Sequence, residues 1–201
     1  YLTIGTGVGG GAMINGELLH GLLHPEMGHI PLLRPERFSR TAREPESELA
    51  KSPDKKDVLM KPFGSPISVC PFHEDCFEGL ASGPAIEARW GEKAEYLPVG
   101  HPAWEAEASH IAGAMRSFIC TFSPQRIILG GGVMTQSHLF PMIRKKTLAA
   151  LNGYIQAPEI LRRMDEYIVP AALEGKAGIL GAFVLAEKAF NRQDTKDAKV
   201  L

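Results

Sequence analysis

Short apolar runs alternate with segments of helical periodicity along this chain. Three runs have the length and composition of buried strands: residues 1–4, 125–129 and 167–170. Four segments have helical spacing or open with a helix-starting Ser-Gly-Pro: residues 82–90, 102–121, 137–151 and 177–190. Strands that alternate with helices predict an α/β layer architecture.

Glycine clusters follow two of the predicted strands. Residues 5–10 satisfy the spacing Gly-x-Gly-x-x-Gly, but a dinucleotide-binding turn also needs a helix directly after it. Because residues 12–14 look like a strand and Asn15-Gly16 like a tight turn, we expect a hairpin instead. Glycines let backbone amides approach an anion closely, and a second run at 130–132 joins a strand to a helix. Together the two clusters favour a phosphate or nucleotide site over two simple bends.

Residues 34–69 differ in composition from the rest of the chain. They hold five of its fifteen prolines, and about half of residues 34–57 are charged, without an apolar period. This composition favours a solvated loop or inserted flap, for which we predict neither regular structure nor chemistry of its own.

The overall composition is that of an ordinary globular domain. Of the 201 residues, 44% are hydrophobic and 22% are charged, which disfavours both disorder and a coiled coil. The 22 basic and 23 acidic residues give a net charge of −1, so no global positive field attracts nucleic acid or an anionic membrane. The apolar stretches fall far short of the about 20 residues that a membrane helix needs. Three cysteines cannot form a disulfide framework, which predicts a reducing, cytoplasmic compartment.

Cys70, His73 and Cys76 place three potential zinc ligands within seven residues. Thiolates and imidazole at this density suit tetrahedral Zn²⁺; three ligands would leave an open position, whereas four would make a closed, structural site. The best candidate for a fourth ligand is His29, directly before the charged segment, which would then loop out from the metal. Three residues are weaker candidates: His20, His24 and Cys120. On spacing alone, two unrelated buried cysteines and a surface histidine remain the alternative.

In this order, the motifs resemble those of the ROK (repressor, open reading frame, kinase) sugar kinases, most closely the bacterial-type fructokinase branch. The matching segments are residues 3–11, 24–29, 70–79, 81–86 and 127–134, and the closing helix also looks like the end of that family. The most specific of them are His-Pro-Glu-Met-Gly-His at 24–29 and Cys-Pro-Phe-His-x-x-Cys at 70–76. His73, where most relatives carry cysteine and glycine residues, points to the fructokinase branch.

The resemblance implies an actin-like ATPase (ribonuclease H-like) fold of two lobes with ATP between them. Residues 1–201 would form the C-terminal lobe, with residues 34–69 as an insertion that is longer than expected for this branch. The chain opens at Tyr1 inside a strand-like run, which we interpret as the interior of a longer protein. The family's first phosphate loop and its catalytic aspartate would then precede Tyr1, so we expect no catalytic residue in this chain.

The resemblance also implies roles for individual residues. Glu26 and His29 would contact sugar hydroxyls. Four residues would hold a structural zinc that clamps the sugar-site loop: His29, Cys70, His73 and Cys76. Eleven residues would contact ATP: Gly5, Thr6, Gly7, Gly83, Pro84, Gly130, Gly131, Gly132, Val133, Met134 and Thr135.

The implied function is ATP-dependent phosphorylation of a hexose, D-fructose to fructose 6-phosphate, with Mg²⁺ accompanying ATP. The partners would be a hexose and ATP, without nucleic acid or membrane, in a homodimer. Two alternatives stay open: a sugar-sensing transcriptional regulator of the same superfamily, and a zinc-stabilised sugar-binding lobe without chemistry. The Cys-x-x-His-x-x-Cys pattern favours the enzyme.

Overall fold

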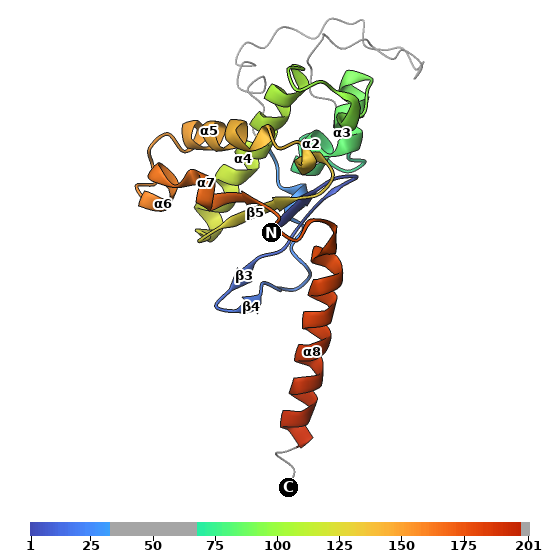
Figure 1. Cartoon of the computed structure of the whole chain (residues 1–201), viewed down its shortest axis with the longest axis vertical. Coiled ribbons are helices and arrows are strands. Elements are labelled where there is room, and N and C mark those ends of the chain that lie inside the picture. Colours follow the sequence, from blue (N-terminus) through green and yellow to red (C-terminus); the bar gives the residue numbers. More distant parts are fainter. Residues whose placement is uncertain (33–67, 198–201) are drawn as a thin grey trace, which may run out of the picture.

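A four-stranded sheet lies at the centre of the chain, whose computed structural model describes residues 1–32 and 68–197. Its strands lie in the order β2-β1-β5-β6: β1 (Leu2–Ile4), β2 (Val8–Gly10), β5 (Ile127–Gly130) and β6 (Ile168–Pro170). β1, β5 and β6 run parallel, whereas β2 turns back antiparallel on β1. Helices α2 to α5 lie on one side of this sheet (Figure 1).

The parallel strands form the centre of the sheet because their side chains are apolar and buried. Leu2 pairs with Leu129, and Ile127 pairs with Ile168; all four are buried, as is Ile4. Continuous apolar character is expected of parallel strands that are covered by helices. The carboxyl ends of β1, β5 and β6 therefore share one edge, the edge at which open α/β sheets bind ligands.

Helices and short 3-10 turns connect the strands. The helices are α2 (Phe77–Ala81), α3 (Gly83–Trp90), α4 (Ala103–Phe122), α5 (Leu139–Leu151), α6 (Pro158–Arg162) and α7 (Met164–Tyr167). The turns are η1 (Met27–His29), η3 (Ala94–Tyr96), η4 (Val133–Thr135) and η5 (Glu174–Lys176). α4 packs against α5 and α2. Its buried face carries Trp104, Ile111 and Met115 at helical spacing, which makes α4 the main apolar surface of the core.

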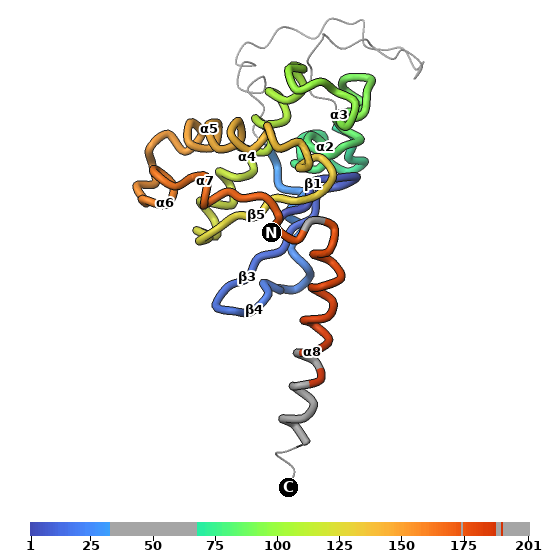
Figure 2. Tube along the Cα trace, in the orientation of Figure 1, coloured from blue at the N-terminus to red at the C-terminus, as the bar shows by residue number. Residues whose placement is uncertain are grey.

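Two elements project from the body. β3 (Met13–Ile14) and β4 (Glu17–Leu18) form a hairpin whose turn residues, Asn15 and Gly16, have φ angles of 53° and 81°, as a tight primed turn requires. The final helix, α8 (Ala177–Asp197), points away from the sheet (Figure 2). Its side chain of Phe183 is 69% exposed, so packing on the core does not hold α8 as it holds α4.

The sequence predicts most of these elements correctly. The strands at 1–4, 125–129 and 167–170, the four long helical segments and the Asn-Gly hairpin are confirmed, and α8 runs further than the predicted 177–190. The glycine cluster at 5–11 differs from expectation, because residues 5–7 form a turn and residues 8–10 form β2. Most of the insertion 34–69 lies outside the described residues. No helix in the described part is long and apolar enough to cross a membrane.

Candidate functional site

Four metal-ligating side chains converge beside η1. One potential ligand atom from each of them lies within 4.8 Å of the others: His29, Cys70, His73 and Cys76. Cys70 Sγ lies 3.5 Å from His73 Nδ1 and 3.8 Å from His29 Nδ1. Two thiols and two imidazoles fit a tetrahedral Zn²⁺ ion better than they fit a hard cation such as Mg²⁺. The weaker candidates His20, His24 and Cys120 are not members of this cluster.

Backbone hydrogen bonds bring the two halves of this cluster together. The Phe77 amide donates to the Ile30 carbonyl over 2.9 Å, and the Leu32 amide donates to the Asp75 carbonyl over 2.8 Å. An isolated bridge between Pro31 and Cys76 lies between these bonds. The resemblance implies that a zinc ion clamps this loop, and the described backbone also joins the His29 turn to the cysteine turn without a metal.

Cys76 starts α2 as well as facing the cluster. Its Sγ accepts a hydrogen bond from the Gly79 amide over 3.3 Å, which caps the helix. Burial raises the pKa of the Cys76 thiol; the Gly79 amide lowers it, while Cys70 and Glu78 raise it further. A bound cation favours the thiolate, so this site offers a buried sulfur that needs positive charge nearby.

The two predicted sugar-binding residues lie at either end of η1. Glu26 precedes the turn and is exposed, and its carbonyl accepts a hydrogen bond from the His29 amide over 3.0 Å. Met27 and Gly28 between them are buried, and a Cβ on Gly28 would lie 2.0 Å from the Val8 carbonyl oxygen. The turn therefore packs directly on β2 and presents the Glu26 side chain to solvent.

The three glycine segments predicted to bind ATP meet at the carboxyl ends of β1 and β5. The Gly83 amide donates to the Gly5 carbonyl over 2.7 Å, and a Cβ on Gly5 would lie 3.5 Å from the Gly132 amide nitrogen. Gly131 has a φ of 94° and leaves no room for a Cβ, which would lie 2.4 Å from the Ile4 carbonyl oxygen. The three glycine segments and the exposed Thr6 are thus gathered in one place, where the Gly5 and Gly83 amides donate within the protein. Close-packed glycine backbone of this kind is typical of an anion-binding site.

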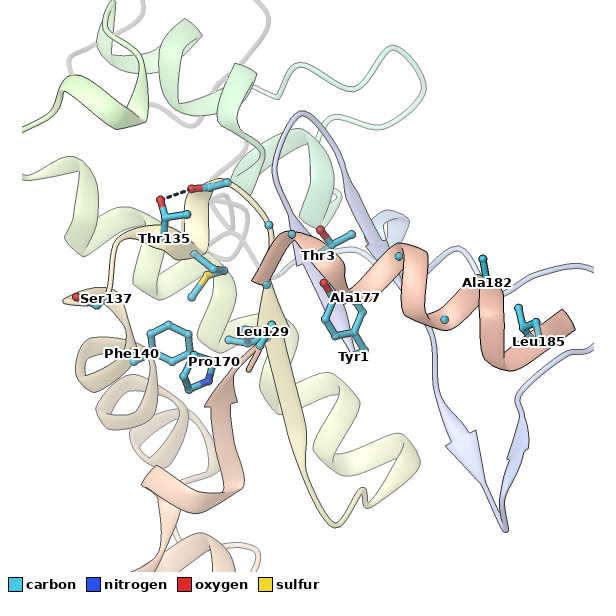
Figure 3. Close-up of a pocket in the computed structure, with 18 residues that line it drawn as sticks. Tyr1, Thr3, Leu129, Thr135, Ser137, Phe140, Pro170, Ala177, Ala182 and Leu185 are labelled. Carbon is cyan, nitrogen blue, oxygen red and sulfur yellow. Dashed lines mark hydrogen bonds between the residues drawn. The ribbon is translucent and has the colours of Figure 1, made fainter. Parts of the chain in front are cut away.

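A cavity of about 1300 Å³ opens beside these glycines (Figure 3). The β5–α5 connection lines one side of it, including five of the predicted ATP-binding residues: Gly130, Gly131, Gly132, Met134 and Thr135. Figure 3 shows the other walls, formed by Tyr1 and by Thr3 of β1, by Phe140 of α5, and by the first half of α8 with Ala177, Ala182 and Leu185. The Thr135 hydroxyl donates to the Gly132 carbonyl over 2.7 Å, and this hydrogen bond stabilises the η4 turn within the connection.

The remaining predicted ATP-binding residues lie outside this lining. Val133 is only 2% exposed and faces the core. The others are grouped around the Gly5 turn: Gly5, Thr6, Gly7, Gly83 and Pro84. Sequence reasoning also missed the walls from Tyr1, Phe140 and α8. For α8, the spacing of its small residues was a usable signal: Ala177, Gly178, Gly181 and Ala182.

The model of the ROK family matches residues 1–189. The chain belongs to the ROK family. A Bacillus subtilis (strain 168) relative is 44% identical over 96% of this chain and 56% of its own length. The fructokinase of Pediococcus pentosaceus is 39% identical over 94% of this chain and 55% of its own length. This ROK chain therefore spans about half the length of the curated relatives it matches.

Solved structures support the fold assignment of this ROK chain. The ROK hexokinase of Thermus thermophilus matches 94% of it with a TM-score of 0.63 and 23% identity, over 57% of the hexokinase chain. A Streptomyces griseus ROK glucokinase, solved with glucose and AMPPNP, matches 93% with a TM-score of 0.58 and 21% identity, over 59% of its chain. The predicted α/β fold of the ROK type is thus confirmed; the roles of individual residues stay predictions.

The backbone at Gly131 gives a first test of this site. We expect Gly131→Ala to destabilise the protein by at least about 2 kcal/mol, because a Cβ would combine an unfavourable φ with overlap on Ile4. Gly132→Ala is the matched control, since nothing lies within 4 Å of its Cβ, and it should change stability by less than about 0.5 kcal/mol. Urea unfolding of both variants measures the difference, and equal midpoints would contradict the described turn.

Proposed function

We propose that this chain is the sugar- and nucleotide-binding half of an ATP-dependent hexose kinase that converts D-fructose to fructose 6-phosphate. The packing of η1 on β2 carries the proposal. It sets the Glu26–His29 turn, suited to sugar hydroxyls, against the hairpin that holds the Gly5–Gly7 turn, suited to phosphates. Relatives named fructokinase, 35–39% identical over most of this chain, support the kinase over a transcriptional regulator.

Each turn has a distinct part in this proposal. The Gly5 amide already donates to the Gly7 carbonyl over 2.9 Å. The Thr6 and Gly7 amides and the Thr6 hydroxyl would donate hydrogen bonds to phosphate oxygens, where negative charge accumulates during phosphoryl transfer. The Glu26 carboxylate would accept hydrogen bonds from sugar hydroxyls and fix which hydroxyl faces the phosphate. Mg²⁺ bound to ATP would neutralise phosphate charge. The proton of the attacking hydroxyl would be taken by an aspartate that the resemblance places outside this chain.

The proposed zinc ion has a structural role only. Four protein ligands close the tetrahedral site and leave no position for a substrate, so the ion would order the cysteine turn beside the sugar site. We also propose that the protein is a homodimer located in the cytoplasm, as expected from the sequence.

We expect about one tightly bound Zn²⁺ per chain in the purified protein. Cys76→Ser should lower this content sharply, because it removes a buried thiolate ligand. Cys120→Ser is the matched control, since Cys120 is exposed on α4 and outside the cluster. Elemental analysis of the three proteins measures the content. Equal zinc in the two variants would remove Cys76 from the ligand set.

Glu26→Ala in the intact enzyme should weaken the handling of sugar without releasing zinc. A hydrogen bond to a charged group is worth roughly 1.5–3 kcal/mol, which corresponds to about 10–150-fold in kcat/KM for fructose. Glu92→Ala, at another exposed glutamate beyond α3, is the control. Steady-state kinetics with varied fructose and varied ATP separates the two substrates. An unchanged fructose dependence would take Glu26 out of the sugar site.

The 201-residue chain by itself should not phosphorylate fructose. It spans 55–57% of its curated relatives, and the catalytic base is expected in the remaining part. Loss of a general base alone typically costs about 10²–10⁴-fold in rate. A coupled assay of ADP release compares the chain with the intact Pediococcus relative. Turnover within about tenfold of that relative would show that the base lies in this chain.

A further inference from the structure

Arg144 of α5 does not line the cavity itself, but its guanidinium joins α5 to a neighbouring strand. Its Nε and Nη2 groups both donate to the Ile168 carbonyl, over 3.0 and 2.8 Å. The Nη2 group also donates to the Asp165 carbonyl over 3.1 Å. These three bonds tie α5 to α7 and to the first residue of β6.

The same guanidinium packs on an aromatic ring of its own helix. The Cζ atom of Arg144 lies 5.6 Å from the centre of the Phe140 ring, which comes one helical turn earlier. A cation at this distance is attracted to the face of the ring. Because hydrogen bonds fix the guanidinium on α7 and β6, it anchors the Phe140 ring relative to the sheet.

The Phe140 ring and the end of β6 belong to the same side of the cavity. Both Phe140 and Pro170 line it, and Pro170 comes two residues after Ile168, the acceptor of the Arg144 bonds (Figure 3). Among the described strands, β6 is an edge strand that pairs with β5 alone. The contacts of Arg144 therefore add a second support to this wall, from the side of α5.

The lining indicates which part of a nucleotide this wall meets. No residue that lines the cavity in the described part of the chain has a charged side chain. The polar side chains in the lining carry hydroxyl groups: Tyr1, Thr3, Thr135 and Ser137. Apolar walls with a few hydroxyls suit the base and ribose of a nucleotide better than its phosphates. A change in this wall should therefore alter the binding of the nucleoside part.

We propose that Arg144 is a positioning residue for nucleotide binding. It anchors the Phe140 ring to β6, so that this wall of the cavity keeps the shape that accepts the nucleoside. The inference rests on the nucleotide site of the proposed function. Binding of ADP by the unaltered protein tests that site, and the variants below test Arg144.

Arg144→Lys keeps the positive charge but loses the planar group that donates three hydrogen bonds and stacks on the ring. The Kd values for ADP and for adenosine, measured by isothermal titration calorimetry, should rise by the same factor, about 3–10-fold. Arg126→Lys is the matched control, since Arg126 is exposed directly before β5. It should change either Kd by less than about threefold. A rise for ADP without a rise for adenosine would overturn the inference.

A second pair of variants tests whether Arg144 acts through Phe140. Phe140→Leu removes the ring but keeps an apolar side chain at this buried position. In that background, Arg144→Lys should raise the Kd for adenosine by less than about twofold, because the effects of residues in contact are not additive. If Arg144 only stabilised the fold, the change in Kd would be the same in both backgrounds, and that result would contradict a positioning role.

A measurement on the unaltered protein needs no variant that might fail to fold. Adenosine should shift the nuclear magnetic resonance signals of the Arg144 Nε–H group and of the Phe140 ring, whereas inorganic phosphate should leave both in place. The inference is also overturned if Arg144→Lys and Arg126→Lys bind adenosine equally, or if adenosine moves neither signal. If the unaltered protein binds no ADP, the proposed nucleotide site fails first, and Arg144 has no nucleoside to position.

Discussion

The close approach of Gly28 to Val8 fixes the relative positions of the proposed sugar and phosphate turns. A side chain at position 28 would overlap the Val8 carbonyl, so only glycine lets η1 lie flat on β2. Because β2 pairs with β1, η1 is then held at a set distance from the turn between these two strands. Phosphoryl transfer depends mainly on the positioning of donor and acceptor and on stabilising charge, which gives this contact its importance in the proposed function.

Local patterns in the sequence determine the elements that are long or that contain specific turn residues. The helical spacing of Trp104, Ile111 and Met115 identifies α4, and Asn15-Gly16 identifies the hairpin. β2 cannot be predicted in this way, because its glycines show no alternation of side chains. It is a strand because it pairs with β1. α2 cannot be predicted from local patterns either, since five residues are too few to show a helical periodicity. Its N-cap is also an unusual one, the cysteine Cys76, which belongs to the metal cluster as well.

The candidate site shows the same division between local and tertiary information. Spacing indicates three ligands in one turn, but the approach of His29, 41 residues before Cys70, depends on backbone hydrogen bonds between residues that are 43 and 47 positions apart. Val133 and Met134 of the 3-10 turn are both buried in the core, and of the two only Met134 also lines the cavity, which the sequence pattern does not distinguish. Glu78 lies within the segment 70–79 that resembles the family, but no local pattern predicts that its carboxylate accepts a hydrogen bond from the Val8 amide.

The backbone bonds at Ile30 and Leu32 limit what a zinc ion can contribute. These bonds hold the two ends of the segment between His29 and Cys76 together. Zinc therefore does not have to offset the entropy that is lost when these ends are brought together. The ion would instead order residues 68–75, which carry two of its ligands. It would also favour the Cys76 thiolate, and a charged acceptor strengthens the hydrogen bond from the Gly79 amide at the start of α2. That first turn also carries Glu78, whose carboxylate accepts a hydrogen bond from the Val8 amide at the start of β2.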